Sequence, residues 1–353
     1  MSGVPFAYPP EGAVMVSAEG AVVLAHDGFD GRPLWQRTLD ATVVGLAASP
    51  SGVAALDESG LLSRLALSDG APLAAKAVAS SVRAFAHAAR AEVAAILTEG
   101  SLLLVPGDEL PRTVAQVSAF AVAVRADGSA IAVGQPDGRV QVFDAASRTL
   151  LGGCQVQAAV QSVTWSPLGH WVVAAGQQIV AVAPDGSHGE LRYTARGNVV
   201  PECLAPSVDG KLLGFRAGPH LVQVLEWGRS RLVGSAVYER EVGAVAFGAG
   251  RSLGVGLDGG DADRLDLVTE EVFSTTGHPG RPTRSWTVAL RVERGLLADV
   301  LPQVAPPTER VPPLASREKR GVPPTRRVLP WVLGLLVAAL VGAAGLWLGI
   351  LRR

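Results

Sequence analysis

The sequence predicts an all-β fold, namely a seven-bladed β-propeller with four-stranded antiparallel blades, followed by a proline-rich linker and one transmembrane α-helix. Two observations predict the propeller: a unit of about 40 residues repeats along the chain, and glycine-bearing turns separate apolar runs within each unit. One observation predicts the helix: 24 successive residues near the C-terminus carry no charge. The expected domains are the propeller at 11–293, a basic linker at 294–327 and the helix at 328–351.

The repeat is clearest at one turn position, which holds a glycine in every unit at intervals of 38 to 42 residues: Gly20, Gly60, Gly100, Gly138, Gly176, Gly218 and Gly259. A second turn, one strand earlier, holds Gly52, Gly128, Gly169, Gly210 and Gly250. The third unit has Arg90-Ala91 at that place instead. A period near 40 residues with about four strands is that of a propeller blade. Because the first and third units are degenerate, six or eight blades remain alternatives to seven.

The fourth unit shows the pattern best, with Asp127-Gly128 and Asp137-Gly138 between alternating apolar runs. Such turns indicate hairpins, because glycine tolerates positive φ. From Glu11 to Glu293 the units resemble WD40-like repeats, although only Phe143-Asp144 approximates the Trp-Asp ending of that family. The first unit, Val22–Trp35, is more similar to a quinoprotein-type (PQQ-like) repeat. Both resemblances imply a propeller.

Ring closure can also be predicted. The first unit begins at Glu11 and has room for only three strands. The segment after the seventh unit, Trp286–Val292, has the composition of a strand. We therefore expect this segment to be the innermost strand of the first blade, which would leave no open sheet edge.

The C-terminal segments predict a membrane anchor. Seven prolines between Pro302 and Pro324 favour an extended spacer. The uncharged residues 328–351 would span roughly 36 Å as a helix, enough for a bilayer core. The flanking basic residues are more numerous before the helix (Arg310, Arg317, Lys319, Arg320, Arg326, Arg327) than after it (Arg352, Arg353). This asymmetry, and an N-terminus without an apolar signal segment, predict a single-pass inner-membrane protein whose propeller is cytoplasmic.

Several residues of this segment are candidates for contacts in the membrane. Those expected at the membrane interface are Arg326, Arg327, Trp331, Trp347, Arg352 and Arg353. Small residues at helix-packing spacing are Gly334, Ala338, Gly342, Gly345 and Gly349. They favour self-association or pairing with another membrane subunit. The alternative is that glycine and alanine are simply frequent in this chain.

Composition limits the classes of partner. The net charge is −1, so no nucleic-acid partner is expected. Three lysines against 28 arginines are typical of a GC-rich bacterial genome. The two cysteines, Cys154 and Cys203, have no metal-site spacing and are expected to be buried thiols.

No motif indicates catalysis, so we expect no enzymatic activity and no cofactor. The six histidines form no ligand pair and are expected at strand ends or in loops. Gly248–Gly254 resembles a dinucleotide fingerprint but leads into a strand pattern, so a turn is the better interpretation. The acidic loop Asp258–Asp263 is expected to be a solvated hairpin, with a cation site as the alternative. A quinoprotein enzyme is a further alternative, but the tryptophans do not recur at one repeat position.

These features together predict a membrane-tethered interaction scaffold that binds protein partners through its propeller loops. The alternative is a sensor or structural subunit of a membrane complex that assembles through the helix itself. A version without 328–353 distinguishes the two, since only the scaffold would keep its partner.

Overall fold

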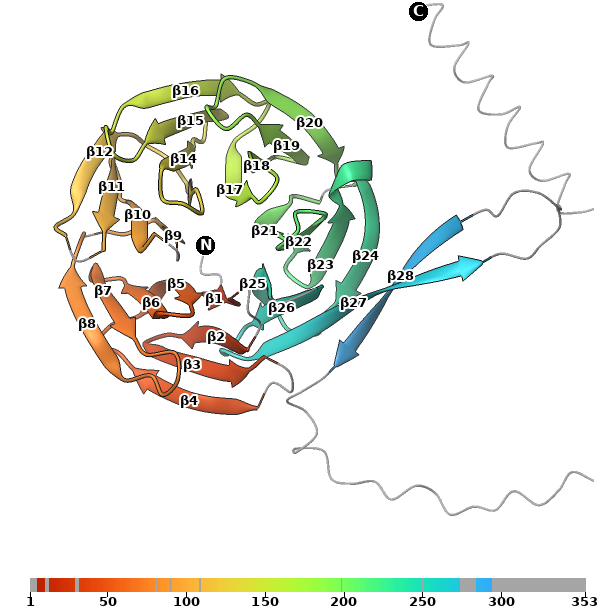
Figure 1. The fold of residues 1–353 in the computed structure, drawn as a ribbon, viewed down its shortest axis with the longest axis horizontal. Coiled ribbons are helices and arrows are strands. Elements are labelled where there is room, and N and C mark those ends of the chain that lie inside the picture. The colour runs from red at the N-terminus through yellow and green to blue at the C-terminus, as the bar shows by residue number, and fades with distance from the viewer. Residues whose placement is uncertain are drawn as a thin grey trace, which may run out of the picture. The chain divides into compact units, whose positions relative to one another are not determined.

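The computed structural model describes residues 5–9, 13–28, 32–79, 81–88, 91–107, 109–197, 199–248, 251–273 and 284–293. These residues form seven four-stranded antiparallel sheets arranged in a ring (Figure 1). The chain is therefore a seven-bladed β-propeller, as the repeat predicts. The ring belongs to one compact unit, Met1–Pro302, whereas the second unit, Gln303–Arg353, lies outside the described residues.

Each blade uses four consecutive strands, from the innermost to the outermost. Blade 1 comprises β1 (Phe6–Ala7), β2 (Val14–Glu19), β3 (Val22–Asp27) and β4 (Pro33–Thr38). Blade 2 comprises β5 (Val43–Ser49), β6 (Gly52–Asp57), β7 (Leu61–Leu65) and β8 (Pro72–Ala77). Blade 3 comprises β9 (Ala84–Ala88), β10 (Val93–Leu97), β11 (Ser101–Pro106) and β12 (Arg112–Gln116). Blade 4 comprises β13 (Ala121–Val124), β14 (Ala130–Gly134), β15 (Arg139–Asp144) and β16 (Leu150–Gln155).

The same order continues to the end of the ring. Blade 5 comprises β17 (Val160–Ser166), β18 (His170–Ala175), β19 (Gln178–Val182) and β20 (Gly189–Thr194). Blade 6 comprises β21 (Glu202–Pro206), β22 (Leu212–Gly218), β23 (Leu221–Glu226) and β24 (Arg231–Val237), with the 3-10 helix η1 (Trp227–Arg229) before its last strand. Blade 7 comprises β25 (Val242–Phe247), β26 (Ser252–Leu257), β27 (Ala262–Phe273) and β28 (Arg284–Glu293).

The turn glycines lie where the repeat places them. The glycine found in every unit lies at or next to the turn between the second and third strands of each blade. At five of these turns the glycine has a positive φ, as at Gly60 (+83°) and Gly138 (+85°), which favours glycine there. These turns and the connections between blades lie at the same end of the ring, because neighbouring strands are antiparallel. We call this end the crossover face.

Apolar residues pack between neighbouring blades rather than at the centre of the ring. Seven clusters of buried residues are found in the described part of the chain, one for each pair of adjacent blades. Blades 4 and 5 share the largest, with 14 buried residues that include the fully buried Trp171. Blades 7 and 1 share the smallest, with four: Phe6, Tyr8, Met15 and Ala262. Among the described side chains, the seam that closes the ring therefore has the fewest buried apolar residues.

The prediction for ring closure is wrong. Trp286–Val292 lies in β28, which pairs with β27 as the outermost strand of blade 7. The innermost strand of blade 1 is β1, whose two residues Phe6 and Ala7 pair with Ser17 and Val16. Strands β27 and β28 are consecutive in the sequence, so pairing them costs less chain entropy than crossing to the first blade. The ring thus includes residues before Glu11.

Two aromatic side chains, Phe6 in β1 and Tyr8 just after it, pack against glycines of β26. A Cβ atom at Gly254 would lie 2.8 Å from both the Phe6 and Tyr8 rings, and one at Gly256 would lie 2.7 Å from Phe6 Cβ. The Tyr8 hydroxyl donates a hydrogen bond to the Gly28 carbonyl at 3.0 Å. Gly254 therefore allows β26 to approach β1 closely. It lies within this strand, and the segment from Gly248 to Arg251 connects β25 to β26, where the sequence predicts a turn.

Among the residues that the structure describes, no helix is long and apolar enough to cross a membrane. The predicted linker from 294 and the predicted helix at 328–351 lie outside those residues.

Candidate functional site

An exposed aromatic side chain lies on the crossover face at the inner edge of the ring. Phe120 immediately precedes β13, the innermost strand of blade 4, and its side chain is 51% exposed. The Phe120 amide donates a hydrogen bond to the Gly134 carbonyl at 2.9 Å, which fixes the backbone at this position. Phe120 is the one aromatic residue among the exposed large apolar residues that the structure describes, and with the arginine beside it this residue marks a candidate binding surface.

The neighbouring blade supplies an arginine to the same place. Arg83 immediately precedes β9, and its guanidinium carbon lies 5.8 Å from the centroid of the Phe120 ring. Its guanidinium is also 3.7 Å from the carboxylate of Glu99, in the β10–β11 turn. The exposed Val44, at the start of β5, lies on the innermost strand of the next blade. Arginine and aromatic side chains together are typical of the residues that dominate protein interfaces.

The opposite part of the crossover face is charged and hydrogen-bonded internally. Arg216 of β22 forms an ion pair with Glu202, and its Nη1 donates to the Val242 carbonyl at 3.0 Å. Arg240 forms a second ion pair with Asp261. These groups satisfy one another between blades 6 and 7. At blades 3 and 4 the same face instead exposes the aromatic ring of Phe120 beside Arg83.

Seven other exposed leucines lie on the outermost strands. Each is among the first three residues of such a strand or lies within two residues before it: Leu34, Leu73, Leu110, Leu150, Leu151, Leu191 and Leu232. The ring spaces its outer strands around the perimeter, so these leucines are spread over six blades (Figure 1). Exposed apolar residues elsewhere are Leu168 and Val208, in turns between first and second strands, and Val200 and Val237, at the crossover end of blades 5 and 6. Single exposed leucines are normal on soluble surfaces and do not indicate a site by themselves.

Within the described part of the chain, no histidine belongs to a group of side chains arranged to hold a metal ion. His170, His188 and His220 lie at a strand start or in turns, as expected, whereas His26 and His87 lie within β3 and β9. His87 is half-buried, and its Nδ1 has no hydrogen-bond partner. Burial and the nearby Arg64 guanidinium lower the pKa of His87 to about 4, although Glu92 opposes this shift. His87 is thus a neutral packing residue between blades 2 and 3.

The depressed pKa of His87 predicts an acid-sensitive seam. In the unfolded chain this imidazole binds a proton near pH 6.5, whereas in the folded protein it does so only near pH 4. Stability is therefore lost as the pH falls from about 6.5 to about 4, by about 1–3 kcal/mol. We expect urea titrations at pH 7 and pH 4.5 to show a smaller loss of stability for His87→Gln than for the wild type. An equal loss for both proteins would contradict this assignment.

The acidic loop and the cysteines offer no reactive group. Within the described residues, no group of three or more His, Cys, Asp or Glu side chains is arranged to hold a metal ion. In the acidic loop, Asp261 is the ion-pair partner of Arg240. Cys154 and Cys203 are free and only partly buried, and burial raises the pKa of both thiols. A raised pKa leaves little thiolate at neutral pH, so neither is an activated nucleophile.

The residues predicted to contact the membrane are not placed by the structure. Gly334, Ala338, Gly342, Gly345 and Gly349 lie outside the described residues, as do Arg326, Arg327, Trp331, Trp347, Arg352 and Arg353. The surface around Phe120 was not predicted from the sequence. Its one sequence signal is an aromatic residue in the connection between two blades, where the other connections of the ring carry none that is exposed in the described residues.

No family model matches the chain, and no curated protein matches it. Among solved structures, the chain is similar to the β-propeller domain of Cps50 (Swd1) from Myceliophteria thermophila, at 14% identity and a TM-score of 0.65, covering 75% of this chain and 97% of that one. It is also similar to hydrazine synthase of Kuenenia stuttgartiensis, at 12% identity and a TM-score of 0.62, covering 72% of this chain and 92% of that one. At these identities the similarities show the propeller fold alone.

Proposed function

We propose that this protein is a membrane-tethered interaction scaffold whose cytoplasmic propeller binds a protein partner on the crossover face, without catalysis. The observation that carries the proposal is the exposed Phe120 ring with the Arg83 guanidinium over it. An aromatic ring and an arginine presented by two rigid blades are held in place before binding, which reduces the entropy lost when a partner docks. The tether adds local concentration at the membrane without any new contact.

The membrane part of the proposal rests on the sequence. The uncharged stretch 328–351 has the length and composition of a spanning helix, and six basic residues precede it. The basic residues favour a cytoplasmic propeller. The small residues of the stretch leave a second role open, in which the helix itself contacts another membrane subunit.

An affinity purification tests the crossover face. The tagged full-length protein, extracted from membranes with mild detergent, is expected to retain a discrete protein partner. Phe120→Ala should lower the recovery of that partner at least about tenfold, because truncating a central aromatic contact typically costs 2 kcal/mol or more. Leu150→Ala is the matched control, since Leu150 is 53% exposed on the outer edge of the same blade. Undiminished recovery with Phe120→Ala would contradict the proposal for this face.

A version without 328–353 then separates the two roles. A scaffold retains its partner in this version, whereas a subunit that assembles through its helix loses the partner while the propeller stays folded.

A further inference from the structure

A cleft lies between the outer edges of blades 5 and 6, away from the crossover surface at Phe120. Its volume is about 670 Å³, within the range of ligand pockets. The residues that line it include Tyr193, Arg196, Gln223, Arg229, Arg231 and Leu232. They come from β20 and its following connection, from β23, from η1 and from the start of β24.

The cleft has an excess of positive charge. Three of its lining residues are arginines, and no acidic residue is among them. Glu226 is the nearby carboxylate: it lies 3.5 Å from Arg229 and 3.1 Å from Arg231. Arg196 has no ion-pair partner among the described residues. Two guanidinium groups thus share one carboxylate at one end of the cleft, and the third has none at the other end, so the imbalance favours an anionic ligand.

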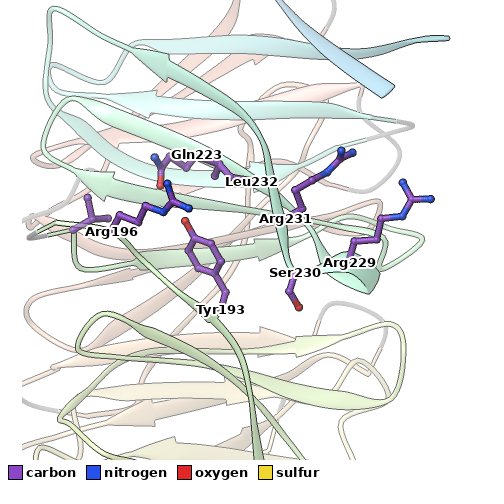
Figure 2. Close-up of a pocket in the computed structure, with 8 residues that line it drawn as sticks. Tyr193, Arg196, Gln223, Arg229, Ser230, Arg231 and Leu232 are labelled. Carbon is purple, nitrogen blue, oxygen red and sulfur yellow. The ribbon is translucent and has the colours of Figure 1, made fainter. Parts of the chain in front are cut away.

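The guanidinium groups lie at the two ends of the cleft and not in one cluster. Figure 2 shows the guanidinium group of Arg196 beside the Tyr193 hydroxyl and Gln223, with Arg229 and Arg231 toward the other end. Gln223 pairs with Ser235, four residues along β24 from Arg231. At about 3.3 Å per residue, the two ends are about 13 Å apart. A single phosphate or carboxylate cannot contact arginines at both ends.

The middle of the cleft is suited to an apolar group. Leu232 is partly exposed there, and Val199 lines the same space. An extended peptide rises about 3.3 Å per residue, so acidic side chains four or five residues apart reach both ends while an aliphatic one lies between them. A nucleotide fits less well, because Tyr193 is the one aromatic side chain that lines the cleft.

We propose that this cleft binds an extended acidic peptide of a protein partner, with its carboxylates at Arg196 and Arg231 and an aliphatic residue against Leu232. The site is separate from the surface at Phe120. The propeller then holds two protein segments at separate places, one at blades 3 and 4 and one along the outer edges of blades 5 and 6.

Fluorescence polarisation with the full-length protein in detergent tests the proposal. The probe is a fluorescein-labelled hexapeptide, Asp-Glu-Leu-Val-Glu-Asp, at about 50 mM salt, where charge interactions are weakly screened. We expect Arg196→Gln combined with Arg231→Gln to weaken binding roughly tenfold, since each guanidinium–carboxylate contact is lost. Arg139→Gln removes an exposed arginine of blade 4 and should change binding less than twofold. Arg196→Lys should retain part of the affinity, and Phe120→Ala should retain all of it.

Three outcomes overturn the proposal. The double variant binds the probe as the wild type does, or the hexapeptide with Asn and Gln in place of its acids binds equally well. In the third outcome, inorganic phosphate or phosphatidylserine vesicles displace the labelled probe as well as the unlabelled peptide does at the same concentration of anionic groups. The cleft would then be a site for a small anion or a lipid headgroup. None of these outcomes bears on the crossover face, which the Phe120→Ala purification tests independently.

Discussion

Replacing Phe6 and Tyr8 together by alanine should destabilise the propeller by about 4 kcal/mol or more, or prevent it from folding. Both side chains are buried in the seam between blades 7 and 1, the smallest apolar cluster of the described ring. Truncating a buried aromatic residue typically costs about 3–5 kcal/mol, because the cavity does not collapse fully. The change also removes the hydrogen bond from Tyr8 to the Gly28 carbonyl. Losing this seam leaves the ring open, with the edges of two blades exposed to aggregation.

The measurement is a urea titration of the full-length protein followed by tryptophan fluorescence. Phe120→Ala is the matched control, because it removes an exposed aromatic side chain and should change stability by no more than about 0.5 kcal/mol. A double variant with no larger effect than this control would show that β1 does not close the ring.

The contact of Gly254 with the Phe6 and Tyr8 rings allows a second, independent test of the same packing. Gly254→Ala places a methyl group 2.8 Å from the Phe6 and Tyr8 rings and should be destabilising, whereas Gly100→Ala meets no atom within 4 Å. In the Phe6→Ala, Tyr8→Ala background the rings are absent, so the cost of Gly254→Ala should fall. Coupling of this kind is expected only between residues in contact. An unchanged cost in that background would contradict the packing of β1 on β26.

Introducing two charges into the predicted anchor should release the protein from membranes. Leu336→Arg with Leu340→Arg adds about 5–7 kcal/mol to insertion, since each arginine at a helix centre costs roughly 2.5–3.5 kcal/mol. We expect the wild type to remain in the membrane pellet after carbonate extraction and the variant to appear in the supernatant. The propeller of the variant should stay folded, because residues 328–351 belong to the other of the two compact units.

The control is a variant with Arg310→Gln and Arg317→Gln, which changes two residues before the uncharged stretch. This variant should stay in the membrane pellet, because the uncharged stretch is intact. Recovery of the wild type in the supernatant would contradict the tether.

The sequence predicted the fold through its turns. The recurring glycine marks the turn after the second strand of each blade, because tight turns between antiparallel strands favour residues that tolerate positive φ. The turn pattern did not predict which strands close the ring, and the reason is physical. Strand β1 has two residues, too few to show an alternating pattern, and Trp286–Val292 has the composition of a strand without indicating which neighbour it pairs with.

The candidate surfaces depend on contacts between blades, which repeat periodicity does not specify. Arg83 and Phe120 are separated by one blade of sequence and meet only because the ring places β9 beside β13. The arginines of the cleft likewise come from blades 5 and 6. The acidic loop and the glycine-rich segment were expected to lie in turns, and both lie beside the strands of blade 7, where Asp261 pairs with Arg240.

The most direct test of the central claim is photo-crosslinking from position 120 in intact membranes. Phe120→p-benzoylphenylalanine places the reactive group on the crossover face, and Leu150→p-benzoylphenylalanine places it on the outer edge of blade 4 at similar exposure. The scaffold account predicts one discrete protein adduct from position 120 and none from position 150. Adducts from both positions alike, or from neither, would contradict the assignment of the crossover face as the surface that binds the partner.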